Sequence, residues 1–377
     1  MGIYLDNAAT TNLCREAAEA MRPYYGMEYY NPSSGYAASK RVKAKLEESR
    51  AVIAGLIGAK AEEIFFTSGG TESDNWAVNE GVRLKGHIIS TAIEHKAILN
   101  PLNEYRMRNG KVDIVYPDRE GIVHPASIRM KINRGTKLVT VMMANNEIGT
   151  IQPIKDIGHM VHEHDIIFHT DAVQAFGHIP VNVDDLAVDM LSASSHKFHG
   201  PKGVGFLYAR KETGLHPFMF GGGQERGMRG GTENVPGIIG MTAAAEVSVR
   251  RMKDSMAYCQ KLNNHISYRI LHEVPDAIIN GSRESRLPNN ISISFKGIDA
   301  QSLLVMLDMK GISASAGSAC NTGRKSASHV LKAINVPEEY IGGTLRLTID
   351  SDITFRQADY AVDIIKMCVS GLRKKQY

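Results

Sequence analysis

The sequence predicts an α/β fold in which a mostly parallel sheet forms a large domain and a smaller α+β domain follows it. The chain has 377 residues, which is more than one small hydrophobic core accommodates. Its composition, 43% hydrophobic and 22% charged, is that of an ordinary globular protein. Between about residues 60 and 210, strand-like apolar runs alternate with helical patterns. Such alternation indicates βαβ units, whose parallel sheet is covered by helices on both faces.

Seven strand-like runs define the predicted sheet. They are residues 63–68, 87–92, 111–116, 136–144, 166–172, 188–194 and 203–209. Helical patterns separate them, at 72–84, from about Lys96, and at 154–164, where apolar residues recur at helical spacing. The large domain is therefore expected to hold a seven-stranded, mostly parallel sheet.

The composition changes after a glycine-rich loop at 221–237. The elements expected there are a long helix to about residue 273, a strand at 291–297, a helix at 300–310, a loop of small residues at 314–323, a helix at 326–334, a strand at 344–349 and a last helix at 355–372. We expect residues 15–255 to form the large domain. Residues 1–14 and 256–377 are expected to form the small one.

Charge and hydropathy exclude several classes of protein. Forty-four Lys and Arg against 40 Asp and Glu leave a net charge of +4, so no nucleic-acid partner is expected. No apolar run is long enough to cross a bilayer, and the segment MGIYLD lacks the regions of a signal peptide. We therefore expect a cytoplasmic protein with no membrane contact. The four cysteines show no CxxC pair and no zinc spacing, so free thiols and no resident metal are expected.

Polar residues follow the predicted strands at the points where the strands end. They are Gly70 and Thr71, His95, Asn146, Asp171 and Lys197. In open α/β sheets, ligands bind outside the carboxyl ends of the strands. These residues are thus candidates for one binding site.

Gly70 and Thr71 stand between a strand and the start of a helix, where free backbone amides and the helix dipole favour an anion such as a phosphate. A plain glycine turn with Thr71 as the helix cap is the alternative. Lys197, in SSHKFHGPKG, is placed to form an imine with a carbonyl compound, although a solvated loop lysine fits the same pattern.

Asp171 ends a buried strand, where a carboxylate is costly unless it faces a cation such as a pyridinium nitrogen. As an isolated residue it could equally be a helix cap. His95 could stack on an aromatic cofactor and move protons, or it could simply begin a helix. Together, a phosphate site, a lysine, an aspartate and a histidine suit pyridoxal 5'-phosphate.

Eight motifs in one order extend this reading to most of the chain. They are YLDNAATT, TSGGTESDN, EHKAIL, NNEIGT, TDAVQ, SSHKFHGPKG, GGGQERGMRGGT and SAGSAC. In this combination the sequence resembles the NifS/IscS-type cysteine desulfurases, pyridoxal phosphate enzymes of the class V aminotransferase family with the type I fold.

The resemblance implies a role for each matching residue. Lys197 bonds the cofactor covalently, Asp171 pairs with its ring nitrogen and His95 stacks on the ring and exchanges protons. Asn146 and Gln174 contact the ring substituents. The phosphate contacts would come from Gly70, Thr71, Ser194 and His196, with Thr232 reaching the phosphate of a neighbouring subunit, which makes a homodimer the expected assembly. Arg346 and Asn31 would bind the substrate, L-cysteine; an outward-facing arginine on an edge strand is the alternative for Arg346.

Cys320 corresponds to the cysteine that accepts sulfur as a persulfide while alanine is released. The small residues before it suit a loop that moves between the cofactor and an acceptor protein, either an iron–sulfur scaffold or an enzyme of nucleic-acid thiolation. Cys320 is also a possible transient iron–sulfur ligand.

The chain departs from the family pattern at three places. Asn12 replaces a usual proline, Asp350 stands where glycine is common, and NTGRKSAS follows Cys320. These departures bear on the sulfur acceptor, so two alternatives stay open. One is a selenocysteine lyase or another class V aminotransferase; the other is a cofactor-binding sulfur-relay subunit.

Overall fold

A seven-stranded sheet lies at the centre of the computed structural model, which describes residues 2–316 and 328–374. In spatial order the strands are β2 (Ile64–Thr67), β8 (Gly205–Ala209), β7 (Met190–Ser194), β6 (Ile167–Asp171), β5 (Thr136–Thr140), β3 (His87–Thr91) and β4 (Val112–Val115). β8 is antiparallel to both of its neighbours, and the other pairs from β7 to β4 are parallel. The predicted mostly parallel seven-stranded sheet is confirmed.

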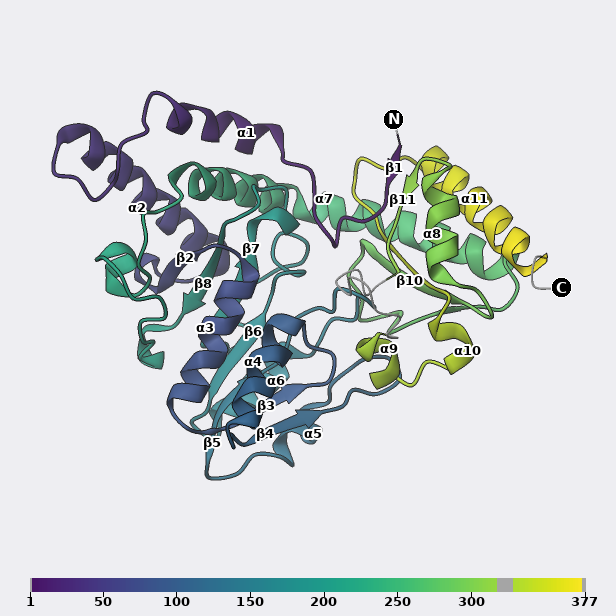
Figure 1. Cartoon of the computed structure of the whole chain (residues 1–377), viewed down its shortest axis with the longest axis horizontal. Coiled ribbons are helices and arrows are strands. Elements are labelled where there is room, and N and C mark those ends of the chain that lie inside the picture. The colour runs from purple at the N-terminus through teal and green to yellow at the C-terminus, as the bar shows by residue number, and fades with distance from the viewer. Residues whose placement is uncertain (1, 317–327, 375–377) are drawn as a thin grey trace.

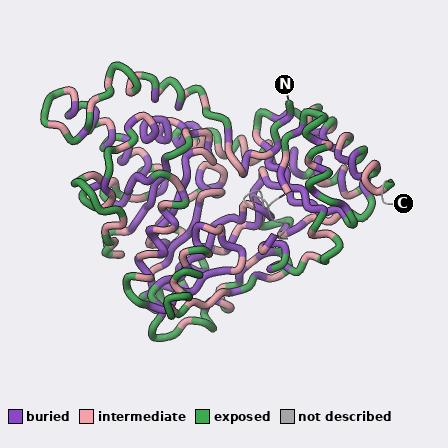
Figure 2. The backbone as a smooth tube through the Cα atoms, viewed as in Figure 1, coloured by how far each residue is buried: buried purple, intermediate pink, exposed green. Residues whose placement is uncertain are grey.

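Helices cover the sheet and explain why its strands are continuous apolar runs (Figure 1). The helices of this part are α1 (Arg15–Met21), α2 (Ala37–Ile57), α3 (Gly70–Arg83), α4 (Lys96–Met107), α5 (Pro125–Arg129) and α6 (Ile154–His162). Every residue of β2, β3, β7 and β8 is buried, and the interior of the molecule is mostly purple, the colour of buried residues, in Figure 2. The strand predicted at 136–144 ends early, at Thr140. Beyond it the buried backbone continues towards the next strand end, where Met143 N donates to Asp171 O at 2.8 Å.

The second part of the chain forms its own hydrophobic core. An antiparallel sheet of β12 (Thr344–Thr348), β10 (Asn290–Phe295) and β9 (Ala277–Ile279) packs with α8 (Ala300–Asp308) and α11 (Phe355–Lys374). β1 (Ile3–Tyr4) pairs with β11 (Ile312–Ser313), so the first residues of the chain join this core. Two short helices, α9 (His329–Ala333) and α10 (Glu338–Ile341), lie between β11 and β12 in the sequence.

One helix belongs to both cores. α7 (Val235–Glu273) runs for 39 residues. Apolar residues of its first part, up to Ala245, are buried in the core of the large sheet, and Cys259, Leu262, Ile266 and Ile270 are buried in the second core. The domain boundary predicted at residue 255 thus falls inside α7.

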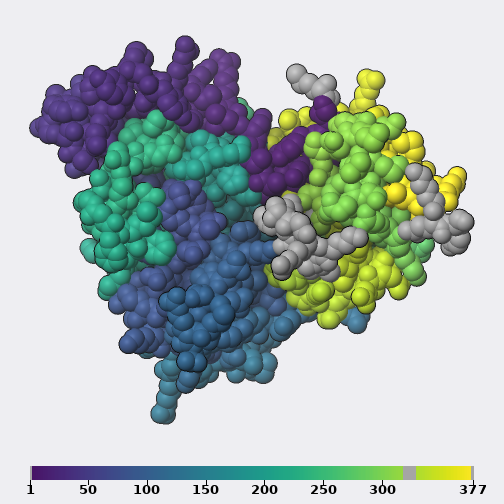
Figure 3. All heavy atoms as spheres, in the orientation of Figure 1, coloured from purple at the N-terminus to yellow at the C-terminus, as the bar shows by residue number. Residues whose placement is uncertain are grey.

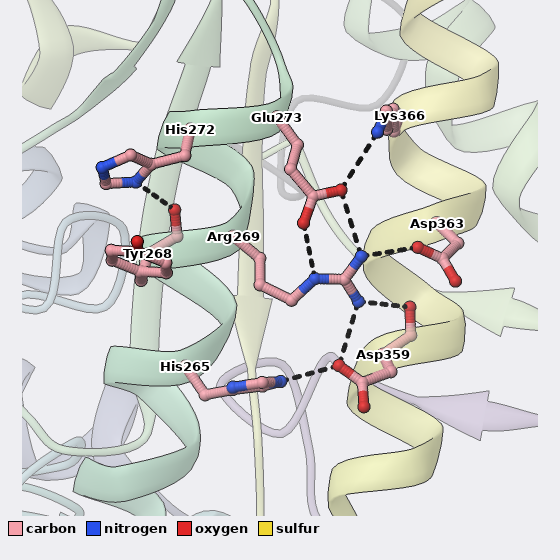
Figure 4. A network of polar contacts seen from close by, with 8 residues as sticks. All are labelled: His265, Tyr268, Arg269, His272, Glu273, Asp359, Asp363 and Lys366. Atoms are coloured by element: carbon pink, nitrogen blue, oxygen red, sulfur yellow. Dashed lines mark hydrogen bonds and ion pairs between the residues drawn. The ribbon is translucent and has the colours of Figure 1, made fainter.

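A partly exposed charge network joins the end of α7 to α11 (Figure 4). The guanidinium of Arg269 contacts Glu273 at 2.7 Å, Asp359 at 2.9 Å and Asp363 at 2.7 Å. Lys366 adds a contact to Glu273 at 3.1 Å. Because these groups form a network rather than isolated pairs, they fix the packing of the two helices more firmly than single surface pairs do.

Residues 5–12, which we call the N-terminal strap, run between the two parts of the molecule (Figures 1 and 3). On one side the strap is bonded to β12: Thr348 N donates to Leu5 O at 2.7 Å, and Ala8 N donates to Thr348 Oγ1 at 2.8 Å. On the other side it is bonded to the loop after β7, where Thr11 N donates to His196 O at 2.9 Å. The strap therefore connects strand β12 to the loop that carries Lys197.

Candidate active site

A cavity of about 330 Å³ opens where the strand ends of the large sheet face the strap and β12. Its walls include most of the residues predicted from the sequence: Gly70, Thr71, His95, Asn146, Asp171, Gln174, Ser194, His196, Lys197 and Arg346. These come from positions nearly 280 residues apart in the chain. The parallel topology gathers the strand ends, and the second core adds Arg346 from the opposite side.

The amine of Lys197 points into the cavity from a short turn after β7. Its Nζ donates to the carbonyl oxygens of Ala8 at 2.6 Å and Ala9 at 2.9 Å, both in the N-terminal strap. Gln174 Nε2 also donates to Ala8 O, at 3.0 Å. A solvated loop lysine has no such setting: the amine of Lys197 is held at the wall of the cavity by the N-terminal strap.

Two of the buried carboxyl groups that line the cavity are Asp171 and Asp74. Asp171 is 5% exposed and its Oδ1 accepts from Val173 N at 2.8 Å; Asp74, on α3, is 1% exposed. Burial, and for Asp74 also the nearby Asp171 charge, raise the pKa of both carboxyl groups. Asp74 Oδ1 has no hydrogen-bond partner among the described residues. A cationic donor in the cavity would stabilise this pair as carboxylates, which fits a protonated ring nitrogen.

The cavity has an anion-binding wall at the start of α3. Gly69 caps this helix with φ 147° and makes no side-chain cap, so the alternative of Thr71 as the cap is wrong. A Cβ on Gly70 would stand 2.6 Å from Val173 Cγ2 and 3.5 Å from Ser194 Cβ. The backbone here is packed too closely for a side chain, and the free amides of the first turn are available to a phosphate.

His95 caps α4 and lines the same cavity. Its Nδ1 accepts a hydrogen bond from Ala97 N at 3.1 Å, and burial lowers the pKa of the ring. The neutral ring therefore carries its proton on Nε2, which is the nitrogen left to exchange a proton with a ligand.

Arg346 is 2% exposed, so the alternative of an outward arginine on an edge strand is wrong. One terminal nitrogen pairs with Asp6 at 2.7 Å and the other donates to Asn146 O at 3.0 Å. Nε is buried with no hydrogen-bond partner among the described residues. A bound carboxylate would satisfy this guanidinium in competition with Asp6.

Several lining residues were not predicted from the sequence: Ala8, Ala9, Asp74, Glu94, Glu147, Ser328 and His329. Glu94 is fully buried, and burial raises its pKa to about 8. Its Oε1 accepts from Thr91 Oγ1 at 2.6 Å and Met142 N at 2.9 Å, which anchors the segment before His95. Its position next to His95 in EHK was the one available signal.

Three predicted residues are not among the lining residues. Asn31 is exposed and its Oδ1 accepts from Ser33 N at 2.9 Å, which stabilises a local turn. Thr232 lines a separate cavity of about 200 Å³ together with Thr67, Ser68 and other residues. Cys320 lies outside the described residues. The roles predicted for these three stay predictions.

Residues 2–316 and 328–374 contain no group of three or more His, Cys, Asp or Glu side chains arranged to hold a metal ion. The helices of these ranges are each too short or too polar to span a bilayer.

Comparison with known proteins gives consistent matches over the chain. The aminotransferase class-V family profile matches residues 3–360. Cysteine desulfurase IscS of Dictyoglomus turgidum is 45% identical, covering 98% of this chain and 95% of the relative. Cysteine desulfurase IscS of Methanosarcina thermophila is 44% identical, covering 98% and 93%.

Solved structures agree. A NifS-like protein superposes with a TM-score of 0.93 at 36% identity, covering 99% of this chain and all of the other. A structure of SspA in complex with cysteine superposes with a TM-score of 0.81 at 34% identity, covering 92% and 98%.

Proposed function

The chain belongs to the aminotransferase class V family, among its cysteine desulfurases, and we propose that it transfers the sulfur of L-cysteine to Cys320 and releases L-alanine. One observation carries the proposal: a lysine amine, a buried carboxyl pair and a buried arginine face one cavity. Relatives named cysteine desulfurase match nearly the whole chain, and a similar protein has been solved with cysteine bound.

The residues of the cavity fit pyridoxal 5'-phosphate. Lys197 would hold it covalently, Asp171 would face its ring nitrogen, and the start of α3 with Ser194 and His196 would hold its phosphate. Asn146 and Gln174 would contact the ring substituents. When bound, this cofactor supplies an electron sink that stabilises negative charge on the substrate's α-carbon.

The chain's own groups would orient the substrate and move its protons. Arg346 would bind the carboxylate of cysteine through its planar fork, which displaces the contact with Asp6. The amine of Lys197, released when the substrate binds, would remove and return the proton on the α-carbon of the substrate. His95 would exchange a proton through Nε2.

Sulfur transfer would involve Cys320. Its thiolate forms an S–S bond with the substrate sulfur while the C–S bond breaks, so Cys320 is left as a persulfide. The electron pair of the broken bond stays with the substrate, which takes up protons and leaves as alanine. An acceptor protein for iron–sulfur assembly or nucleic-acid thiolation would then receive the sulfur, with Cys320 as a possible transient cluster ligand.

We also propose a homodimer. Thr232 lies apart from the Lys197 cavity within one chain, in a glycine-rich loop next to the segment that leads into α3. That position suits a residue that acts on the phosphate site of a second subunit. Sedimentation of the purified protein measures the assembly.

Cys320→Ala tests the function. With L-cysteine and a thiol reductant, the wild type should form alanine and sulfide in equal amounts, and the variant should lose sulfide release from cysteine. Retention of the wild-type rate would refute the persulfide role and favour a selenocysteine lyase or another class V enzyme. Absence of turnover by the isolated wild-type protein would favour a sulfur-relay subunit.

A further inference from the structure

His199, two residues after Lys197, is bonded through both ring nitrogens. Nε2 lies 3.0 Å from Asp350 Oδ2, and Nδ1 lies 2.9 Å from Asn12 Oδ1. Asp350 accepts from Nε2, and the amide oxygen of Asn12, in the orientation that the structure gives it, faces Nδ1; two acceptors on one ring suit an imidazolium, which carries a proton on each nitrogen. Asn12 and Asp350 are two of the three departures from the family pattern noted in the sequence, and both contact this histidine.

The backbone of His199 is also held in an unusual conformation. Its φ is 66°, in the left-handed region, which is costly for a residue with a side chain. Two hydrogen bonds maintain it: His199 N donates to Thr11 Oγ1 at 2.8 Å, and Cys14 N donates to His199 O at 2.9 Å. The Lys197 loop is thereby fixed to the N-terminal strap at one more point.

Asp350 extends this connection to the second core. It follows β12, the strand that carries Arg346. The preceding residue, Ile349, is held in place because its backbone N donates a hydrogen bond to Asn289 O at 2.9 Å. The side chains of His199 and Asp350 are 22% and 21% exposed, so solvent screens their charges only in part. The pair thus spans directly from the loop of the candidate catalytic lysine to the strand of the candidate substrate arginine.

We propose that His199 is a positioning residue that, held as an imidazolium between Asp350 and Asn12, fixes the Lys197 loop relative to the Arg346 strand and makes this arrangement dependent on pH. The expected effect on the binding of cysteine rests on the proposed function, whereas the link between the Lys197 loop and the Arg346 strand does not.

The titratable groups that face the pair determine the pH range. Burial lowers the pKa of His199, but Asp350 and Asp352 outweigh it, so the pKa is raised overall. Burial raises the pKa of Asp350, but His199 and His178 outweigh it, so that pKa is lowered overall. The thiol of Cys259 also lies within reach of both aspartates, and burial, followed by their charges, raises its pKa to about 12. It therefore stays neutral.

The two pKa shifts set the pH range in which the pair of His199 and Asp350 stabilises the folded protein. The raised pKa of His199 gives stability that is present in full below the unfolded value of 6.5 and is lost as pH rises through the folded value. The lowered pKa of Asp350 gives stability that is present above 3.8 and is lost as pH falls through its folded value. The connection is therefore intact in mildly acidic solution, below pH 6.5, and opens as pH rises through the folded pKa of His199.

Hydrogen–deuterium exchange with mass spectrometry tests the connection on the holoenzyme. After correction for the intrinsic pH dependence of exchange, peptides covering 7–14 and 195–203 should exchange faster in the wild type as pH rises above neutrality. Asp350→Asn should exchange faster in both peptides at neutral pH. If Asp350→Asn does not fold, His199→Gln takes its place in the test. Glutamine keeps a hydrogen-bond donor but carries no charge, so the pH dependence of exchange should disappear in this variant.

Asp118→Asn is a matched control, because Asp118 pairs with the exposed His124 at 2.7 Å outside the cavity. It should leave both peptides unchanged. Wild-type exchange in Asp350→Asn, or a pH dependence that persists in His199→Gln, would overturn the connection.

Steady-state kinetics test its effect on the substrate. In Asp350→Asn, KM for cysteine should rise by about tenfold, with a smaller change in kcat, because the substrate arginine is less well positioned while the reacting groups are unchanged. Faster exchange without any change in KM would overturn the positioning role. If Cys320→Ala stayed fully active while the exchange results held, the proposed function would fail and the connection would stand.

Discussion

A methyl group added at Gly70 should disturb the candidate phosphate wall in a way that a second substitution repairs. In Gly70→Ala the new Cβ would lie 2.6 Å from Val173 Cγ2, whereas ordinary contact begins at 3.4 Å. The two atoms must therefore separate by about 0.8 Å to reach ordinary contact. Val173 N bonds to Asp171, so this displacement acts on the turn that holds the buried carboxylate.

The expected magnitude follows from two opposed effects. Overpacking in a well-packed region costs about 1–3 kcal/mol. Alanine favours a helix over glycine by less than about 1 kcal/mol, and α3 begins at this residue. We expect Gly70→Ala to destabilise the protein by about 1–2 kcal/mol, and to weaken pyridoxal phosphate binding by about 5- to 30-fold because the helix-start amides move.

Urea unfolding of the apoprotein and absorbance titration with pyridoxal phosphate measure the two effects. The double variant Gly70→Ala/Val173→Ala, which removes Cγ2, should recover about 1 kcal/mol relative to the sum of the single variants. Gly55→Ala is the control, since a Cβ on this helical glycine of α2 meets nothing within 4 Å. Equal behaviour of the Gly70 and Gly55 variants, or no coupling with Val173, would refute the packing described here.

Two other predictions concern buried and catalytic charges. Glu225 accepts hydrogen bonds from Arg50 at 2.7 and 2.8 Å, and both side chains are at most 4% exposed. Glu225→Gln should therefore lower the free energy of unfolding by about 3–5 kcal/mol. Glu104→Gln, which removes the charge of an exposed pair with Arg108, should change it by less than about 1 kcal/mol. A small effect at Glu225 would contradict the assignment of this pair as buried. Lys197→Ala should fold normally by circular dichroism but lose the visible absorbance of covalently bound pyridoxal phosphate; colour that survives dialysis would exclude Lys197 as the attachment point.

The large sheet was predictable because its strands are buried on both faces. Continuous apolar runs such as 87–92 and 203–209 leave one interpretation once helical patterns separate them. The strand that ends at Thr140 was predicted too long, because Val141–Ala144 are equally buried and apolar. Composition alone does not distinguish a strand from the buried segment that continues beyond it.

Residues of the candidate site could be grouped from the sequence only where the topology of the sheet brings them together. Lys197 and Asp171 lie at the ends of adjacent strands, so their proximity follows from a parallel sheet. Asp74 lies inside a helix, and nothing in its neighbourhood distinguishes it from a solvated carboxylate. The pair of His199 and Asp350 joins residues 151 positions apart, and a contact across two cores has no local signature.

The helix α7 bears on how the molecule unfolds. At 1.5 Å per residue its 39 residues form a continuous rod of about 58 Å. If either core melted alone, half of this rod would lose the packing that supports it and would fray into the other half. The two cores are therefore expected to behave as one cooperative unit, with a single equilibrium transition in denaturant instead of two.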